Sequence, residues 1–175
     1  AIGYGVVDAT AATTGQISSI AFPDNKEDIY LSWIGAGLGI GVVGGLTILF
    51  NHEQILLDIF EGWHYYRQYL EKNPLLKGNQ INTWNGRWIS QRYDREYDSD
   101  DPLMNFNPLV PMSDGLFNLQ TVPWAEVIAG IARNNRTSNM VGYLYSIGQT
   151  NTTVGFIPFK LQDIIPVSYT HLTLP

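Results

Sequence analysis

The longest periodic pattern of hydrophobic and polar positions in this chain lies between Asn51 and Asn73. Its large apolar residues recur at spacings of three and four, which matches the turn of an α-helix: Ile55, Ile59, Trp63, Tyr66 and Leu70. Asn51 is a favourable N-cap residue, and Asn73 precedes a proline, which disfavours helical backbone at the residue before it. The pattern therefore predicts one long amphipathic helix over residues 51–72.

Shorter β-branched and aromatic runs on either side of this helix are typical of strands. We expect strands at residues 2–8, 16–22 and 29–34, a hairpin turning at Asn85-Gly86 with arms 81–84 and 87–90, and a last hairpin from residues 139–147 and 153–160. Residues 123–133 begin with proline, carry an early glutamate and end with arginine, which predicts a short helix. The predicted fold class is α+β, with a mainly antiparallel sheet.

Six glycines fall within residues 35–45. Each glycine inside a helix costs about 1 kcal/mol relative to alanine, so this composition disfavours a soluble helix. From Gly35 to Val42 the glycines alternate with apolar residues, which predicts a strand whose bare face packs closely against a neighbour. Gly44-Gly45 is then expected to form a tight turn between two strands.

The same run contains Gly39-x-Gly41-x-x-Gly44, and it resembles in pieces the first turn of FAD- and NAD-binding Rossmann domains. In that family the glycines let backbone amides approach the pyrophosphate. The resemblance implies, as an alternative, a fragment of a FAD- or NAD-binding oxidoreductase with these three glycines at the cofactor. A helix that begins at Asn51 excludes this alternative, because residues 55–61 would have to form the second Rossmann strand.

Residues 29–50 contain no charged side chain and are long enough to span a bilayer, which gives a second alternative, a membrane-embedded segment. The glycines dilute the hydrophobicity of this stretch. Its flanks are mainly acidic and carry Lys26 as their single basic side chain, without the clustered lysines and arginines that anchor membrane helices. We therefore do not expect the chain to insert into a membrane.

Composition narrows the classes of function. The chain has 175 residues, 45% of them hydrophobic, which is enough for a single domain over residues 1–166. Its net charge of −6 argues against nucleic-acid binding by bulk charge. There is no cysteine, so a disulfide framework and a thiolate metal site are excluded. We expect a cytoplasmic, non-enzymatic protein without cofactor or metal.

One segment departs from the acidic background. Residues 63–93 hold five basic side chains against Glu71 alone, a local balance of 5 − 1 = +4, and they are rich in tryptophan and tyrosine. Basic groups that neutralise phosphates and aromatic faces that stack on bases are the combination that single-stranded nucleic-acid sites use. The candidate nucleic-acid-binding residues are Arg67, Lys72, Lys77, Trp84, Arg87, Trp88 and Arg92. The favoured hypothesis is a binding subunit of a larger protein or ribonucleoprotein assembly.

Both ends of the sequence are unusual. Residue 1 is alanine and leads directly into strand-like sequence, so we expect the native chain to continue upstream. Residues 167–175 resemble a translated sequencing adapter, and we expect this tail to be non-native.

Overall fold

The computed structural model describes residues 26–135, 139–146 and 152–160. The strands predicted at residues 2–8 and 16–22, and the adapter-like tail, lie outside these described residues. The chain divides into two compact units, Ala1–Gly37 and Leu38–Pro175, which are described separately.

The first unit contributes the helix α1, Lys26–Gly37, so the strand predicted at residues 29–34 is wrong. Glu27 and Asp28 stand in the first turn, where negative side chains favour a helix N-terminus. Tyr30 and Trp33, three residues apart, make an edge-on ring contact with centroids 5.7 Å apart. These helix-specific interactions outweigh the strand propensity of the individual residues.

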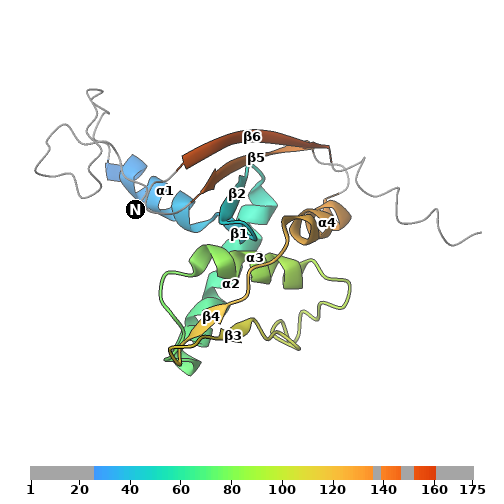
Figure 1. The fold of residues 1–175 in the computed structure, drawn as a ribbon. Coiled ribbons are helices and arrows are strands. Elements are labelled where there is room, and N and C mark those ends of the chain that lie inside the picture. Colours follow the sequence, from blue (N-terminus) through green and yellow to red (C-terminus); the bar gives the residue numbers. More distant parts are fainter. Residues whose placement is uncertain (1–25, 136–138, 147–151, 161–175) are drawn as a thin grey trace, which may run out of the picture. The chain divides into compact units, whose positions relative to one another are not determined.

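A four-stranded antiparallel sheet organises the second unit, and its strand order is β1-β2-β5-β6 (Figure 1). The strands are β1, Ile40–Val42; β2, Leu46–Phe50; β5, Asn139–Ser146; and β6, Thr152–Lys160. Gly44 and Gly45 form the predicted turn between β1 and β2 together with Val43. Their φ angles of 96° and 72° lie in the left-handed region, which favours glycine. The last hairpin of the sequence prediction is likewise confirmed as β5 and β6.

Within the described residues of this unit, the remaining elements are three helices and a second, two-stranded sheet. They are α2, Glu53–Lys72; α3, Ile81–Arg92; α4, Trp124–Asn134; β3, Leu109–Pro111; and β4, Phe117–Leu119. The predicted long helix and short helix are confirmed as α2 and α4. The N-cap of α2 is His52 rather than Asn51, and no side chain caps it. The antiparallel sheets, together with these helices, confirm the α+β fold class.

Helix α3 overturns the hairpin predicted at Asn85-Gly86. Both residues are buried inside the helix, so their usual turn preference is irrelevant here. The Asn85 side chain bridges two elements, accepting a hydrogen bond from Trp63 Nε1 (3.0 Å) and donating one to the Gly39 carbonyl (2.8 Å). A Cβ on Gly86 would run into the Gly41 carbonyl of β1, so glycine here allows close helix–strand packing.

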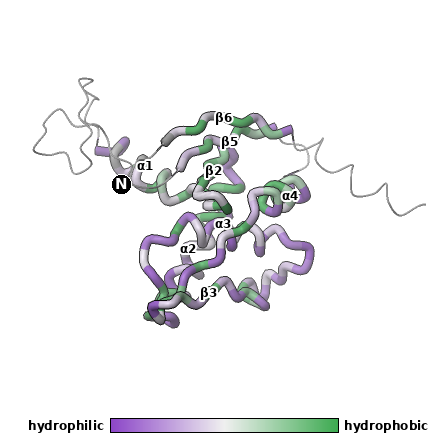
Figure 2. The backbone as a smooth tube through the Cα atoms, viewed as in Figure 1, coloured by the Kyte–Doolittle hydropathy of each residue, from purple (hydrophilic) through white to green (hydrophobic). Residues whose placement is uncertain are grey.

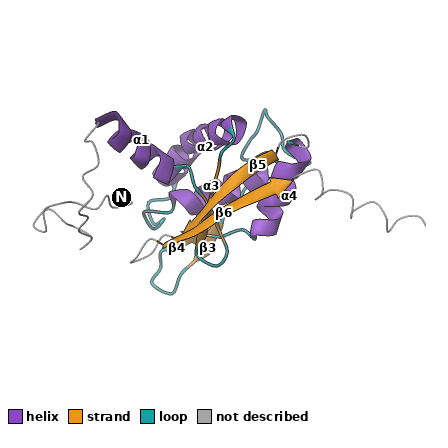
Figure 3. Ribbon diagram, turned by 90° about the horizontal axis from the view of Figure 1, so that it is seen from above, coloured by secondary structure: helices purple, strands orange, loops and turns teal. Residues whose placement is uncertain are grey.

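The core joins one face of the sheet to the buried sides of the helices. Ile40, Ile48 and Leu144 lie opposite one another across β1, β2 and β5, and all three are buried. The helices contribute Ile55, Ile59, Trp84, Trp88, Val127 and Ile131 to the same cluster. Figure 2 shows hydrophobic segments along β5, β6 and α4, and Figure 3 shows the long β5–β6 ribbon beside these helices.

The glycine run is therefore the end of one helix followed by a hairpin. Because β1 and β2 are antiparallel and joined by the three-residue turn 43–45, the strand–turn–helix arrangement of a Rossmann domain is absent from residues 40–50. In the described part of the chain, no helix has both the length and the apolar character needed to cross a bilayer.

Candidate functional site

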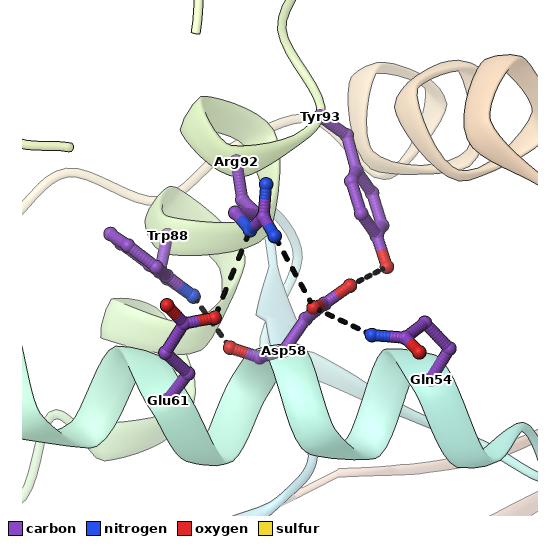
Figure 4. A network of polar contacts seen from close by, with 6 residues as sticks. All are labelled: Gln54, Asp58, Glu61, Trp88, Arg92 and Tyr93. Atoms are coloured by element: carbon purple, nitrogen blue, oxygen red, sulfur yellow. Dashed lines mark hydrogen bonds and ion pairs between the residues drawn. The ribbon is translucent and has the colours of Figure 1, made fainter. Parts of the chain in front are cut away.

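A buried carboxylate lies between α2 and α3 (Figure 4). Asp58 is only 4% exposed, and its oxygens accept hydrogen bonds from the Tyr93 hydroxyl (2.5 Å) and from Gln54 Nε2 (3.1 Å). Its backbone carbonyl accepts a hydrogen bond from Trp88 Nε1 at 2.7 Å. Asp58 of α2 thus binds both Trp88 and Tyr93 at the C-terminal end of α3. A buried charge satisfied in this way specifies how the two helices fit together.

Arg92 supplies the positive charge of this network. Its Nη2 lies 3.8 Å from Asp58 Oδ1, and its Nε lies 3.9 Å from Glu61 Oε2. The guanidinium also stands over the Tyr97 ring, 4.7 Å from the centroid, in a cation–π arrangement. Since two carboxylates and an aromatic ring already surround this guanidinium, it is poorly placed to neutralise an added phosphate.

The Tyr93 hydroxyl is held in its protonated form. Burial raises the pKa of Tyr93 far above its ordinary value of 10.0, and the hydrogen bond to the Asp58 carboxylate raises it further. A general base or a nucleophile would need the opposite change. The network is therefore suited to holding α2 and α3 together, not to proton transfer at neutral pH.

The two tryptophans of the predicted nucleic-acid face are core residues, and this part of the prediction is wrong. Trp84 and Trp88 are both 0% exposed. Trp84 Nε1 donates to the Gly62 carbonyl at 2.9 Å, and its ring contacts Tyr66, Tyr69 and Phe106. Stacking on a nucleic-acid base needs a free ring face, which neither residue offers.

The basic residues do not gather in one place either. Arg92 is anchored at Asp58, whereas Lys72 lies fourteen residues further along α2, about 21 Å away at 1.5 Å per residue. Arg67 pairs with Glu71 at 3.1 Å on the surface of the same helix. Lys72 and Lys77 are exposed and Arg87 is half-buried, and among the described residues these three form no ion pair.

The glycines of the cofactor alternative are used for packing and for a turn. The Gly39 carbonyl accepts hydrogen bonds from Asn82 Nδ2 (2.9 Å) and Asn85 Nδ2 (2.8 Å). A Cβ on Gly41 would come within 2.9 Å of the Asn82 backbone. Gly44 is a turn residue. Two of these three glycines therefore let α3 lie directly against β1, which leaves no room there for a pyrophosphate.

A partly exposed apolar row on the larger sheet was not found from the sequence. Leu49, Tyr143 and Phe156 lie directly opposite one another on β2, β5 and β6, on the sheet face away from the buried Ile48 and Leu144. Phe156 is 71% exposed. The alternation of apolar and polar residues along β5 and β6 predicted the hairpin, but the sequence did not reveal that Phe156 stays exposed on this face. We call these three residues the aromatic row.

The aromatic row is uncharged, and Tyr143 and Phe156 are held by ring contacts. The rings of Tyr143 and Phe156 are 5.1 Å apart, and Tyr143 stacks on Tyr145 at 5.3 Å. The Tyr143 hydroxyl shares a hydrogen bond of 2.7 Å with Thr153 Oγ1. Val141, two residues before Tyr143 on the same face, adds a side chain that is 41% exposed. Pre-ordered aromatic side chains lose little conformational entropy when a partner binds.

Comparisons with protein-family models, curated proteins and solved structures found no match.

Proposed function

We propose that this chain is a non-enzymatic binding module of a larger cytoplasmic protein assembly, and that the aromatic row is its protein-binding surface. The observation that carries this proposal is the exposure of Phe156 beside Leu49 and Tyr143 in a line across three strands. Tyrosine and phenylalanine are enriched at protein interfaces, and clustered aromatic anchors contribute most of the binding energy there.

The chemistry of the row selects the kind of partner. None of Leu49, Val141, Tyr143 and Phe156 carries a charge, although the chain as a whole has a net charge of −6. A charged peptide or a nucleic acid would lose hydration on this face without gaining a counter-charge. The fitting partner is the apolar face of another protein subunit.

Docking on the sheet face is also favoured over addition of a strand at the edge. β6 is the outermost strand, and within the described residues it pairs only with β5. It contains Pro158, and a proline in an edge strand removes a backbone donor from the free side. Gly155 has a φ of 146°, which further distorts the edge. Strand addition is thereby discouraged, while the side chains of the face stay accessible.

Site-specific photo-crosslinking tests this proposal. The photoreactive analogue p-benzoylphenylalanine replaces Phe156 in one variant, and in a control variant it replaces Val110, an exposed apolar residue of β3. In cells we expect a discrete protein adduct from position 156 only, and we expect the additional change Val141→Lys to abolish it. Equal adducts from both positions, or none from position 156, would contradict the proposal.

Single-stranded nucleic acid is a second candidate ligand, now restricted to one end of α2. Lys72 and Lys77 are exposed and form no ion pair among the described residues, so both ammonium groups are available to phosphates. Arg67 is close in sequence and 80% exposed, although Glu71 partly neutralises it.

A charge-reversal experiment tests this second candidate. The double variant Lys72→Glu with Lys77→Glu should weaken salt-dependent binding of a single-stranded RNA oligonucleotide. Lys160→Glu at the end of β6 is the matched control and should leave binding unchanged. If wild type and the double variant bind equally, this candidate is wrong. Arg92 is unsuitable for the test, because its replacement would leave Asp58 buried without its cation.

A further inference from the structure

The solvent-facing side of α2 carries a second apolar surface, independent of the aromatic row. Phe60 is 59% exposed and Leu57 is 54% exposed, although both lie in the middle of a 20-residue helix. The partly buried Trp63 contacts Phe60, with ring centroids 5.3 Å apart. Leu57 and Trp63 each lie three residues from Phe60, one on either side. Single exposed apolar residues are common on protein surfaces, whereas two large ones side by side are typical of an interaction site.

Charges of opposite sign stand at equal distances from Phe60. Glu53 lies seven residues before Phe60 and Arg67 seven residues after it, and both side chains are exposed. Seven residues are two helical turns, so Glu53, Phe60 and Arg67 fall on one line along α2. The line is acidic at its N-terminal end, apolar in the middle and basic towards its C-terminal end.

This arrangement complements itself when the helix is reversed. In a two-fold symmetric pair of antiparallel helices centred at Phe60, the two Phe60 rings meet and Leu57 of each copy faces Trp63 of the other. Glu53 of each copy then faces Arg67 of the other, which gives two ion pairs, each between a carboxylate and a guanidinium. The existing Arg67–Glu71 pair offers little competition, because an exposed ion pair four residues apart on a helix contributes little to stability.

We propose that two copies of this chain associate through the exposed side of α2, antiparallel and centred at Phe60. A second copy is the occupant that satisfies both the apolar centre and the charged ends, since each end meets its counter-charge. The contact involves one helix from each copy and is smaller than a permanent interface, so dimerisation should depend on protein concentration.

Sedimentation velocity over a concentration series, with charge-swapped variants of the full chain, tests the proposal. Wild type should shift from monomer to dimer, and Phe60→Glu should stay monomeric. Glu53→Arg alone and Arg67→Glu alone should each raise the dissociation constant about tenfold or more, because like charges then face each other at two places. The double variant with both swaps should restore dimerisation, since the charge pairs are re-formed with exchanged signs.

Controls separate this proposal from the proposed function. All the altered residues are exposed, so unfolding midpoints in urea should stay close to wild type. Val141→Lys on the aromatic row should leave the dimer intact even if it abolishes crosslinking from position 156. Wild type that remains monomeric at every concentration, or a double swap that dimerises no better than the single swaps, would overturn the proposal.

Discussion

Asn85 Nδ2 donates a hydrogen bond of 2.8 Å to the carbonyl of Gly39, forty-six residues away along the chain. The same side chain accepts a hydrogen bond from Trp63 Nε1 at 3.0 Å. One fully buried asparagine thus connects α3 both to the segment before β1 and to α2. This contact explains why a residue pair typical of hairpin turns is found inside a helix.

Replacing Asn85 with leucine should lower the free energy of unfolding by about 1–3 kcal/mol, because the Trp63 indole loses its buried acceptor. Urea unfolding measures this as a lower midpoint with an unchanged slope. Asn82→Ala is the milder comparison, since Asn82 is only half-buried and Asn85 would still donate to Gly39. Equal losses from the two variants would show that Asn85 has no special role.

Gly86→Ala should destabilise the protein although alanine is the better helix former. Helix propensity alone predicts a gain of about 1 kcal/mol. However, the added methyl group would overlap the Gly41 carbonyl and would lie 3.1 Å from Val122 Cγ2. Gly78→Ala is the matched control, because nothing lies within 4 Å of its Cβ position. A lower melting temperature for Gly86→Ala only is the expected result, and a higher one would refute the close contact of α3 with β1.

Tyr93→Phe should cost about 1.5–3 kcal/mol at neutral pH, the usual range for a hydrogen bond to a charged group. It should also alter the alkaline pH dependence. The folded protein raises the pKa of Tyr93 above its ordinary value of 10.0, so this contribution is complete below about pH 10 and is lost as the pH rises above it. The stability difference between wild type and variant should therefore shrink above about pH 10 in urea titrations. A constant difference would contradict this account.

Tyr145→Phe should behave in the opposite way. The Tyr145 hydroxyl is buried and has no hydrogen-bond partner among the described residues. Burial, together with the nearby Tyr143, raises its pKa to about 12. Removing a buried hydroxyl that makes no hydrogen bond should leave stability unchanged or increase it at neutral pH. Thermal unfolding of the two tyrosine variants side by side gives the test, and a loss for Tyr145→Phe as large as that for Tyr93→Phe would contradict the structure.

Local sequence signals determined several elements of this fold. The spacing of Ile55, Ile59 and Trp63 predicted α2, because apolar residues that recur about every 3.6 positions line one side of a helix. Gly44 and Gly45 produced the turn between β1 and β2, because only glycine adopts two consecutive positive φ angles at little cost. The alternation of apolar and polar residues predicted the last hairpin, β5 and β6. In each case the information lies within a few neighbouring residues.

Tertiary structure alone decided the rest. Asn85 and Gly86 lie in a helix because burial against Gly39 and Gly41, far away in the sequence, outweighs their preference for a turn. Trp84 and Trp88 resemble stacking residues in the sequence, yet their rings fill the space between α2 and α3. Conversely, Phe60 and Phe156 resemble core residues but are exposed, since no described element covers their faces. Composition and period specify which side chains can be buried, whereas only the packing of distant segments determines which of them are.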